Sequence, residues 1–214
     1  MTDYLILVPL AYLLGSVPFG LVAGRLVANV DVRDYGSGKI GMTNVLRTSG
    51  KTAAAVVLLL DMGKGVLAVL IARWFFDSPG VEVAAALAVL FGHNWPVFIK
   101  FRGGRGTASG WGGLLILSPI AGLIATLIGL GLVALTRYVS LGSIMAASLG
   151  SLALIILAVF GTQLAVPSPP PLEYSWYGVI GGTLIVVRHW DNIRRLLDGT
   201  ERKIGQSVDT DSSH

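Results

Sequence analysis

Long apolar runs, separated by short polar loops, restrict this chain more than any other feature of its sequence. A bilayer core is about 30 Å thick, and a helix of roughly 20 apolar residues crosses it. The runs are Tyr4–Ala28, Thr52–Phe76, Val81–Ile99, Thr107–Thr136, Tyr138–Thr162 and Tyr174–Val187. Hydrophobic residues make up 53% of the chain and charged residues only 13%, which excludes an ordinary soluble domain. We therefore predict an all-α integral membrane protein.

The number of spans depends on the run Thr107–Thr136, which as one helix would be about 45 Å long. Ser118 and Pro119 lie near its middle, so the run can instead form two short spans. The second arrangement places the basic clusters of the chain on one membrane face, as the positive-inside rule prefers. We therefore predict about seven transmembrane helices, with the N-terminus outside and the C-terminus in the cytoplasm.

The domain organisation that we expect is simple. Residues 1–205 form a single membrane domain, and residues 206–214 form a disordered tail. The connector Pro167–Pro171 carries no cation, which suits an outer loop. The chain contains no cysteine, so disulfides and thiolate chemistry are excluded.

The segment Gly92–Gly110 gathers glycines and cations within an apolar sequence. Gly103, Gly104, Arg105 and Gly106 predict a tight turn whose backbone N–H groups converge on an anion. The helix expected from Thr107 would direct its positive end at the same ligand. This pattern indicates a phosphate site, and the alternative is a basic loop that only anchors two helices. His93, beside Trp95 and Pro96, is interpreted as an interfacial anchor.

A second polar cluster, Gly36–Arg47, follows the first apolar run. Ser37, Thr43 and Asn44 can donate hydrogen bonds to phosphate oxygens, and Lys39 and Arg47 supply positive charge. A positive-inside loop would account for the cations but not for the hydroxyl groups and glycines.

A third cluster, Arg188–Lys203, closes the membrane domain. His189 and Asn192 are three residues apart, so on a continuing helix they share a face. Together they can bind a hydroxyl group and a carbonyl or phosphate oxygen, although His189 at a helix end also suits an interfacial position.

Two features fall inside the membrane spans. Asp61 and Lys64 are three residues apart, and a mutual salt bridge is the expected arrangement. Pro18, within Gly15–Gly20, should kink the first helix and free a carbonyl, unless this segment serves only close packing of small residues.

Several catalytic patterns are absent from the sequence. Neither His93 nor His189 is followed at the fifth position by aspartate, so the histidine–aspartate base of many glycerolipid acyltransferases is missing. The sequence also lacks a GxSxG nucleophile, Walker-A spacing and a metal-spaced cluster of histidines and carboxylates.

Taken in order, the segments Gly15–Gly20, Gly36–Arg47, Gly92–Gly110 and Arg188–Lys203 resemble the acyl-phosphate:glycerol-3-phosphate acyltransferases, the PlsY family. The resemblance implies a seven-helix enzyme of the bacterial plasma membrane with its active site on the cytoplasmic face. It implies transfer of an acyl chain from acyl phosphate to the sn-1 hydroxyl of glycerol 3-phosphate, without an acyl-enzyme. The products are lysophosphatidic acid and phosphate. Membrane lipid is the implied surrounding, and neither a cofactor, a metal nor nucleic acid is expected.

The resemblance also assigns roles to residues. The implied catalytic residues are Ser37, Arg47, Arg105, His189 and Asn192. The implied substrate-binding residues are Lys39, Thr43, Asn44, Lys100, Arg102, Gly103, Gly104 and Gly106. Lys39 stands where the family has asparagine and Met42 where it has alanine, while Arg102 and Arg105 replace lysines. The alternative function is a membrane transporter for anions or organophosphates that uses the same cations for selectivity.

Overall fold

The computed structural model describes residues 1–164 and 166–206, and its regular elements in those ranges are all helices. The first half contains α1 (Thr2–Ser16), α2 (Phe19–Ala28), the short 3₁₀ helix η1 (Val32–Asp34), α3 (Met42–Phe76) and α4 (Pro79–Asn94). The second half contains the 3₁₀ helix η2 (Val97–Ile99), α5 (Thr107–Leu117), α6 (Pro119–Thr136), α7 (Val139–Phe160), α8 (Tyr174–Trp176), the π-helical turn η3 (Tyr177–Gly181), α9 (Gly182–Arg188) and α10 (Trp190–Leu197). The predicted tail, apart from Gln206, lies outside the described residues.

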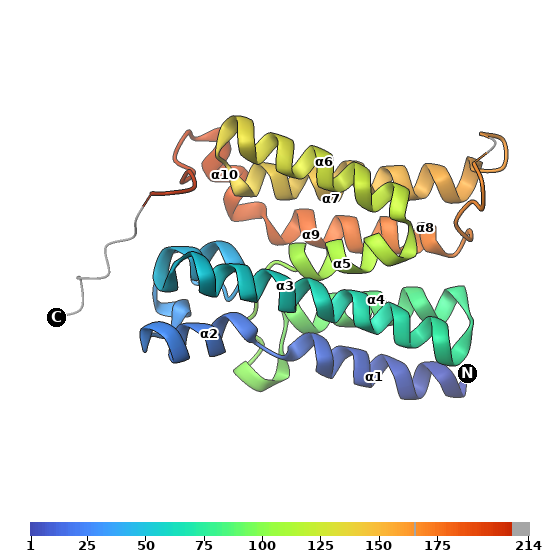
Figure 1. The fold of residues 1–214 in the computed structure, drawn as a ribbon, viewed down its shortest axis with the longest axis horizontal. Coiled ribbons are helices and arrows are strands. Elements are labelled where there is room, and N and C mark those ends of the chain that lie inside the picture. The colour runs from blue at the N-terminus through green and yellow to red at the C-terminus, as the bar shows by residue number, and fades with distance from the viewer. Residues whose placement is uncertain (165, 207–214) are drawn as a thin grey trace.

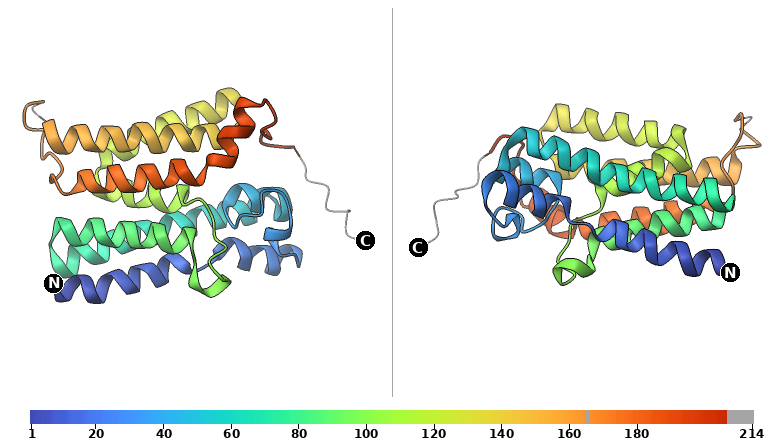
Figure 2. Two further views of the ribbon diagram at one scale, coloured as in Figure 1. Left: turned by 180° about the vertical axis from the view of Figure 1, so that it is seen from behind. Right: turned by 60° about the horizontal axis from the view of Figure 1, so that its bottom comes forward.

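The helices form two layers (Figures 1 and 2). One layer contains α1, α3 and α4, and the other contains α6, α7 and the C-terminal helix α8–η3–α9. The short helix α5 lies between the layers and contacts α3, α4, α6 and α7. The N-terminus and the helix α10 lie at opposite ends of the bundle (Figure 1).

Within residues 1–164 and 166–206, five helical segments are long and apolar enough to cross a membrane by length and composition. They are Thr2–Ala28, Gly50–Phe76, Pro79–Ile99, Pro119–Thr136 and Val139–Phe160. The prediction of an all-α membrane protein is confirmed. The count of seven and the orientation stay predictions, because α5 has only 11 residues and the C-terminal helix is divided by a π turn.

The expected division of the fourth run is confirmed at Ser118, between α5 and α6. Pro119 has no N–H group to continue the hydrogen-bond ladder of α5, but it suits the first position of a new helix. The Ser118 hydroxyl accepts a hydrogen bond from the Ala121 backbone N–H at 3.3 Å and so caps α6.

The first run is also divided, because α1 ends at Ser16 and α2 begins at Phe19. The freed carbonyls of Gly15 and Val17 accept hydrogen bonds from the Lys64 ammonium at 2.9 and 3.2 Å. The segment serves close packing as well, since a Cβ atom on Gly15 would lie 2.3 Å from the Val89 carbonyl oxygen. The predicted ion pair is confirmed, with 2.9 Å between Lys64 Nζ and Asp61 Oδ1.

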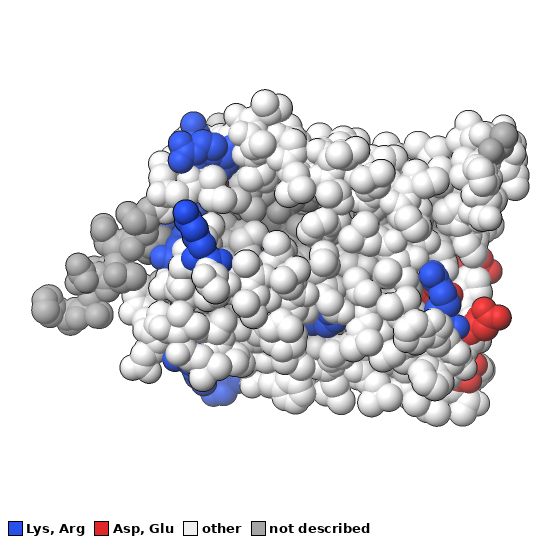
Figure 3. Space-filling model, viewed as in Figure 1, with Lys and Arg blue, Asp and Glu red and all other residues white. Residues whose placement is uncertain are grey.

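The two ends of the bundle differ in charge. On the face in Figure 3, most visible Lys and Arg gather at the end that holds α2 and α10, and Asp and Glu gather at the other. At that other end Arg73 Nη2 lies 2.8 Å from Glu82 Oε2, and the Tyr174 hydroxyl donates to the same oxygen at 2.7 Å. Arg73 also donates to the Ile116 carbonyl at 3.0 Å. This cluster ties α3, α4, α5 and α8 together.

Candidate active site

A cavity of about 580 Å³ opens between the two layers toward the α2 and α10 end. Figure 3 shows the surface hollowed between the layers containing α3 and α6. Its polar walls come from the loop before α3, the start of α5, and the segment that joins α9, α10 and the chain after it. Its apolar walls come from α5, α6 and α7, and include Trp111, Leu114, Leu130, Val133 and Ala146. A ligand that fits the whole cavity therefore has a polar and an apolar part.

Three half-buried cations, Lys39, Arg47 and Arg105, lie at the polar end of this cavity, which the exposed Arg202 also lines. Within the described part of the chain, no salt bridge or side-chain hydrogen bond engages any of them. By contrast Arg33, Arg73 and Arg195 each pair with a carboxylate. Burying unpaired cations is costly, so this arrangement favours an anionic ligand.

The electrostatics of these cations agree with that reading. Burial, with the neighbouring Arg195, lowers the pKa of Arg105 to about 10. Burial also lowers the pKa of Lys39, and the nearby Arg188 and Arg105 add to the effect. Arg105 remains protonated at neutral pH, and a bound phosphate would relieve the repulsion between these groups.

The buried side chain of Asn44 stabilises the loop before α3 through hydrogen bonds to the loop backbone. It is 2% exposed, and its Oδ1 atom accepts a hydrogen bond from the Ser37 backbone N–H at 3.1 Å. Its Nδ2 group donates to the carbonyls of Val32, Tyr35 and Lys39. Although Asn44 reaches the cavity wall, its amide is engaged by the protein. Its place in the site is to position Ser37 and Lys39, whereas Ser37 and Thr43 present side chains to the cavity.

The glycine turn is arranged differently from the sequence prediction. Arg105 and Gly106 line the cavity, and Gly106 adopts φ 81° at the start of α5, a conformation that favours glycine. The Gly104 N–H donates to the His93 carbonyl at 3.0 Å, so this amide does not point at a ligand. Gly103 and Gly104 are buried behind the lining. The predicted convergence of the turn's amides on an anion is therefore wrong for Gly104.

Lys100 and Arg102 do not reach the cavity. Both are exposed on the loop before the turn, and Lys100 and Phe101 adopt φ of 56° and 59°. Neither residue lines the wall that Arg105 forms, although Arg102 is close enough to contribute to lowering the pKa of Lys39. The structure gives no support to substrate binding by these two residues.

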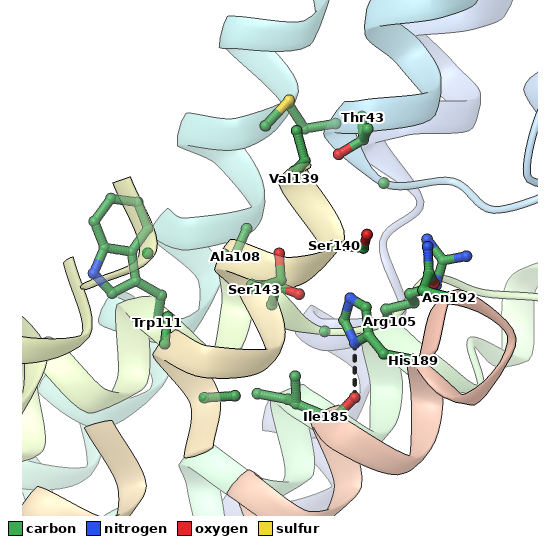
Figure 4. Close-up of a pocket in the computed structure, with 18 of the residues that line it drawn as sticks. Thr43, Arg105, Ala108, Trp111, Val139, Ser140, Ser143, Ile185, His189 and Asn192 are labelled. Atoms are coloured by element: carbon green, nitrogen blue, oxygen red, sulfur yellow. Dashed lines mark hydrogen bonds between the residues drawn. The ribbon is translucent and has the colours of Figure 1, made fainter. Parts of the chain in front are cut away.

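His189 and Asn192 both line the cavity, beside Arg105 (Figure 4). They do not lie on one continuous helix, because α9 ends at Arg188 and α10 begins at Trp190. His189, with φ −97° and ψ 11°, forms the junction. Asn192 donates to Glu201 Oε1 at 2.7 Å. The bend, rather than a common helical face, brings both side chains to the cavity.

The imidazole of His189 has a defined orientation. Its Nδ1 atom lies 2.8 Å from the Ile185 carbonyl, which can only accept, so Nδ1 carries the proton. The other ring nitrogen points into the cavity as an acceptor (Figure 4). Burial lowers the pKa of His189 to about 4, and the neighbouring Arg105 acts in the same direction. A neutral imidazole with a free acceptor nitrogen can accept a hydrogen bond from a substrate hydroxyl, although its lowered pKa makes it a weak base at neutral pH.

Sequence reasoning missed several residues of the site. Ser140 and Ser143, one helical turn apart on α7, both line the cavity (Figure 4). Glu201 accepts hydrogen bonds from Ser140 at 2.8 Å and from Arg195 at 2.7 Å, in addition to that from Asn192. Burial alone would raise the pKa of Glu201, but these hydrogen bonds outweigh it and hold the pKa below its usual value. The sequence signal that could have identified Ser140 and Ser143 is the spacing of two hydroxyl side chains by one helical turn within an apolar run.

His93 is a correction to the sequence analysis. It is 3% exposed and lies with Asp61 at the cavity wall, so it is not an interfacial anchor. Its Nδ1 atom lies 3.4 Å from Asp61 Oδ1. Close packing around Gly92 accounts for its burial, because a Cβ atom there would lie 2.2 Å from the Tyr12 carbonyl oxygen.

The fold and cavity define a membrane-embedded protein that brings an anionic ligand and an apolar chain together. The family model described as glycerol-3-phosphate acyltransferase matches residues 5–199. The chain belongs to this glycerol-3-phosphate acyltransferase family, which includes PlsY.

Relatives and solved structures support this membership. Glycerol-3-phosphate acyltransferases of Thermoanaerobacter sp. (strain X514) and Rubrobacter xylanophilus are 43% and 46% identical over 203 and 200 residues. These alignments cover 94% of this chain in both cases, and 95% and 94% of the relatives. The crystal structure of the integral membrane acyltransferase PlsY (YgiH) in its glycerol 3-phosphate form gives a TM-score of 0.84 at 40% identity, covering 94% of this chain and 96% of that one. Its lysophosphatidic acid form gives 0.82 at 39% identity, covering 94% and 95%.

Proposed function

We propose that this acyltransferase moves a fatty acyl chain from acyl phosphate to the sn-1 hydroxyl of glycerol 3-phosphate. The products are lysophosphatidic acid and inorganic phosphate. The observation that carries the proposal is the set of three half-buried cations, Lys39, Arg47 and Arg105, at one end of a cavity with apolar walls, where they form no salt bridge with the described residues. Both substrates bring a phosphate, and one brings a chain that must remain in lipid.

The transfer is direct in this proposal. The substrate hydroxyl oxygen forms a bond to the acyl carbonyl carbon, and the bond from that carbon to the phosphate oxygen breaks. The phosphate leaves with the electron pair. Acyl phosphate is already activated, so positioning and electrostatic stabilisation supply most of what catalysis requires.

Five polar residues of the cavity take part in this step. Arg105 and Ser37 hold the leaving phosphate, and Arg47 and Asn192 orient glycerol 3-phosphate. The hydroxyl proton passes to the acceptor nitrogen of His189 or to the phosphate of the substrate, whose second pKa is about 6. The orientation of the His189 ring favours a hydrogen bond from the hydroxyl group, whereas its lowered pKa makes the substrate phosphate the stronger base of the two.

We further propose that the protein lies in the bacterial inner membrane with this cavity on the cytoplasmic face. The gathering of cations at the α2 and α10 end supports that orientation. The Arg73–Glu82–Tyr174 cluster ties the helices together at the opposite end, which disfavours a transporter that opens to both faces.

The test uses purified protein in lipid with glycerol 3-phosphate and either palmitoyl phosphate or palmitoyl-CoA. Mass spectrometry follows lysophosphatidic acid, and phosphate release is measured in parallel. We expect product with the acyl phosphate alone. Product only with the CoA ester would discard the proposed donor. No product with either, from folded protein, would bring the transporter forward.

A further inference from the structure

Three ionisable side chains lie buried together beside the glycine turn. Asp61 and Lys64 on α3 are each 2% exposed, and His93 on α4 is 3% exposed. Asp61 Oδ1 lies 2.9 Å from Lys64 Nζ and 3.4 Å from His93 Nδ1. Ionisable groups at membrane depth are expensive, and apolar side chains would fill the same space at lower cost. The cluster therefore calls for an explanation beyond packing.

One side of the cluster is anchored to a backbone break. Lys64 donates to the carbonyls of Gly15 and Val17, where α1 ends and α2 has yet to begin. The Val17 carbonyl also accepts a hydrogen bond from the Phe19 N–H at 3.1 Å, so the ammonium is bound at the junction of the two helices. Lys64 in turn pairs with Asp61, whose Oδ1 atom lies against the ring of His93 at 3.4 Å without a hydrogen bond.

The other side of the cluster contacts the glycine turn. A Cβ atom built on Gly104 would lie 2.1 Å from His93 Nε2, so Gly104 packs directly on the imidazole. The Gly104 N–H also donates to the His93 carbonyl. From the opposite side, Arg188 Nη2 donates to the Gly104 carbonyl at 3.0 Å. The turn is thus held between His93 and Arg188.

We propose that Asp61, Lys64 and His93 form a positioning network that fixes the turn Gly103–Gly106 and thereby directs Arg105 into the cavity. Arg105 has no carboxylate partner in the described part of the chain, so its direction depends on the backbone that carries it. The inference rests on the role proposed above for Arg105. None of the three residues is needed to touch the substrate, and they act through the turn.

The chain offers a matched control. Arg73 and Glu82 also form an ion pair with a buried carboxylate between α3 and α4, but at the far end of the bundle. Glu82→Gln and His93→Asn each weaken a buried polar cluster that joins the same two helices. Only His93→Asn removes the contact with the turn.

The experiment measures backbone hydrogen exchange in the full chain in lipid, together with kcat and KM. For His93→Asn we expect exchange at residues 103–106 to rise about ten-fold and kcat to fall about 10–100-fold. We expect KM for glycerol 3-phosphate to change less than kcat. Glu82→Gln should lower the melting temperature and leave both exchange at the turn and kcat at 25 °C unchanged.

Two outcomes would overturn the proposal: unchanged exchange at the turn in His93→Asn, whether or not kcat falls, or equal loosening of the turn in Glu82→Gln. The exchange measurement needs no acyl donor. It therefore still tests the positioning network if the wild-type enzyme does not use acyl phosphate. That result would contradict only the proposed acyl donor.

A second pair of variants tests the contact between Gly104 and the His93 ring from the side of the turn. The first variant leaves Asp61, Lys64 and His93 in place. Gly104→Ala forces a methyl group against the imidazole and should slow turnover. In Gly104→Ala/His93→Ala the ring is gone, so the added methyl group should cost no further activity than His93→Ala alone. If the fold-reductions in activity of Gly104→Ala and His93→Ala instead multiply in the double variant, the ring and the turn are not coupled, and the inference is overturned.

Discussion

The Ser37 backbone N–H donates a hydrogen bond to the side-chain oxygen of Asn44, seven residues further along the chain. Three more hydrogen bonds from the Asn44 amide gather the backbone of the same loop. The shape of the loop that presents Ser37 and Lys39 is thus determined by one buried side chain.

Asn44→Ala should therefore act first on the fold. Removing the amide leaves buried carbonyls and an N–H group without partners, at a cost of about 2–4 kcal/mol. We expect a clearly lower melting temperature in detergent, with activity lost alongside. Thr43→Val is the neighbouring control and should keep its melting temperature. A stable but inactive Asn44→Ala would instead show direct substrate contact by Asn44.

Arg105→Gln should lower kcat about 10²–10³-fold, because it removes a buried charge that stabilises the leaving phosphate. The measurement is phosphate release at saturating substrates. Lys100→Gln and Arg102→Gln, on the exposed loop outside the cavity, should stay near wild type. Similar losses in all three variants would mean that the loop acts by general surface charge.

His189 predicts a pH dependence of stability. Its pKa in the folded protein is about 4, below the unfolded value of about 6.5. The folded state thus binds fewer protons than the unfolded state in this window, and stability is lost as pH falls from about 6.5 to 4. The full loss is about 3 kcal/mol. His189→Asn should flatten the melting temperature over this range, and equal slopes in both proteins would contradict burial of a neutral imidazole.

The apolar wall predicts a dependence on acyl chain length. Val133 on α6 is part of the apolar wall of the cavity, so Val133→Phe should narrow the space for a long chain. We expect KM for a sixteen-carbon donor to rise while an eight-carbon donor is little affected. Val159→Phe, on the exposed surface of α7, should change neither. A loss that does not depend on chain length would place the acyl chain elsewhere.

The absence of cysteine makes the orientation testable with single introduced thiols. Ser168, between α7 and α8, and Asp198, directly after α10, are both exposed, and the α7–α8 connection and α10 lie at opposite ends of the bundle (Figure 1). An impermeant maleimide should label Ser168→Cys in intact spheroplasts and Asp198→Cys only after lysis. The reverse pattern would invert the proposed topology.

The sequence predicted the features that depend only on residues close together in the chain. Hydropathy located the five long apolar segments found in the described residues, and Pro18 and Pro119 marked two helix breaks, because proline acts on its own neighbours. The ion pair of Asp61 and Lys64 followed from helical spacing alone. These features need no knowledge of which helices are neighbours.

The remainder of the site depends on contacts between distant segments. His93 is buried because glycines let α1 approach α4 closely, and Glu201 reaches Ser140 across 61 residues of sequence. No repeating pattern in the sequence predicts either contact. The bend at His189 was missed because no proline or glycine marks it, and only the structure shows α10 leaving the line of α9.

The cavity between the two layers also sets how the enzyme must be studied. Its charged end suits a water-soluble substrate, whose concentration is expressed per volume of solution. Its apolar walls suit a lipid, whose concentration is expressed per area of membrane. Turnover should then depend on the mole fraction of the acyl donor in the bilayer, and added inert lipid should slow the reaction by dilution in two dimensions. Rates measured in micelles and in vesicles become comparable only on that surface scale.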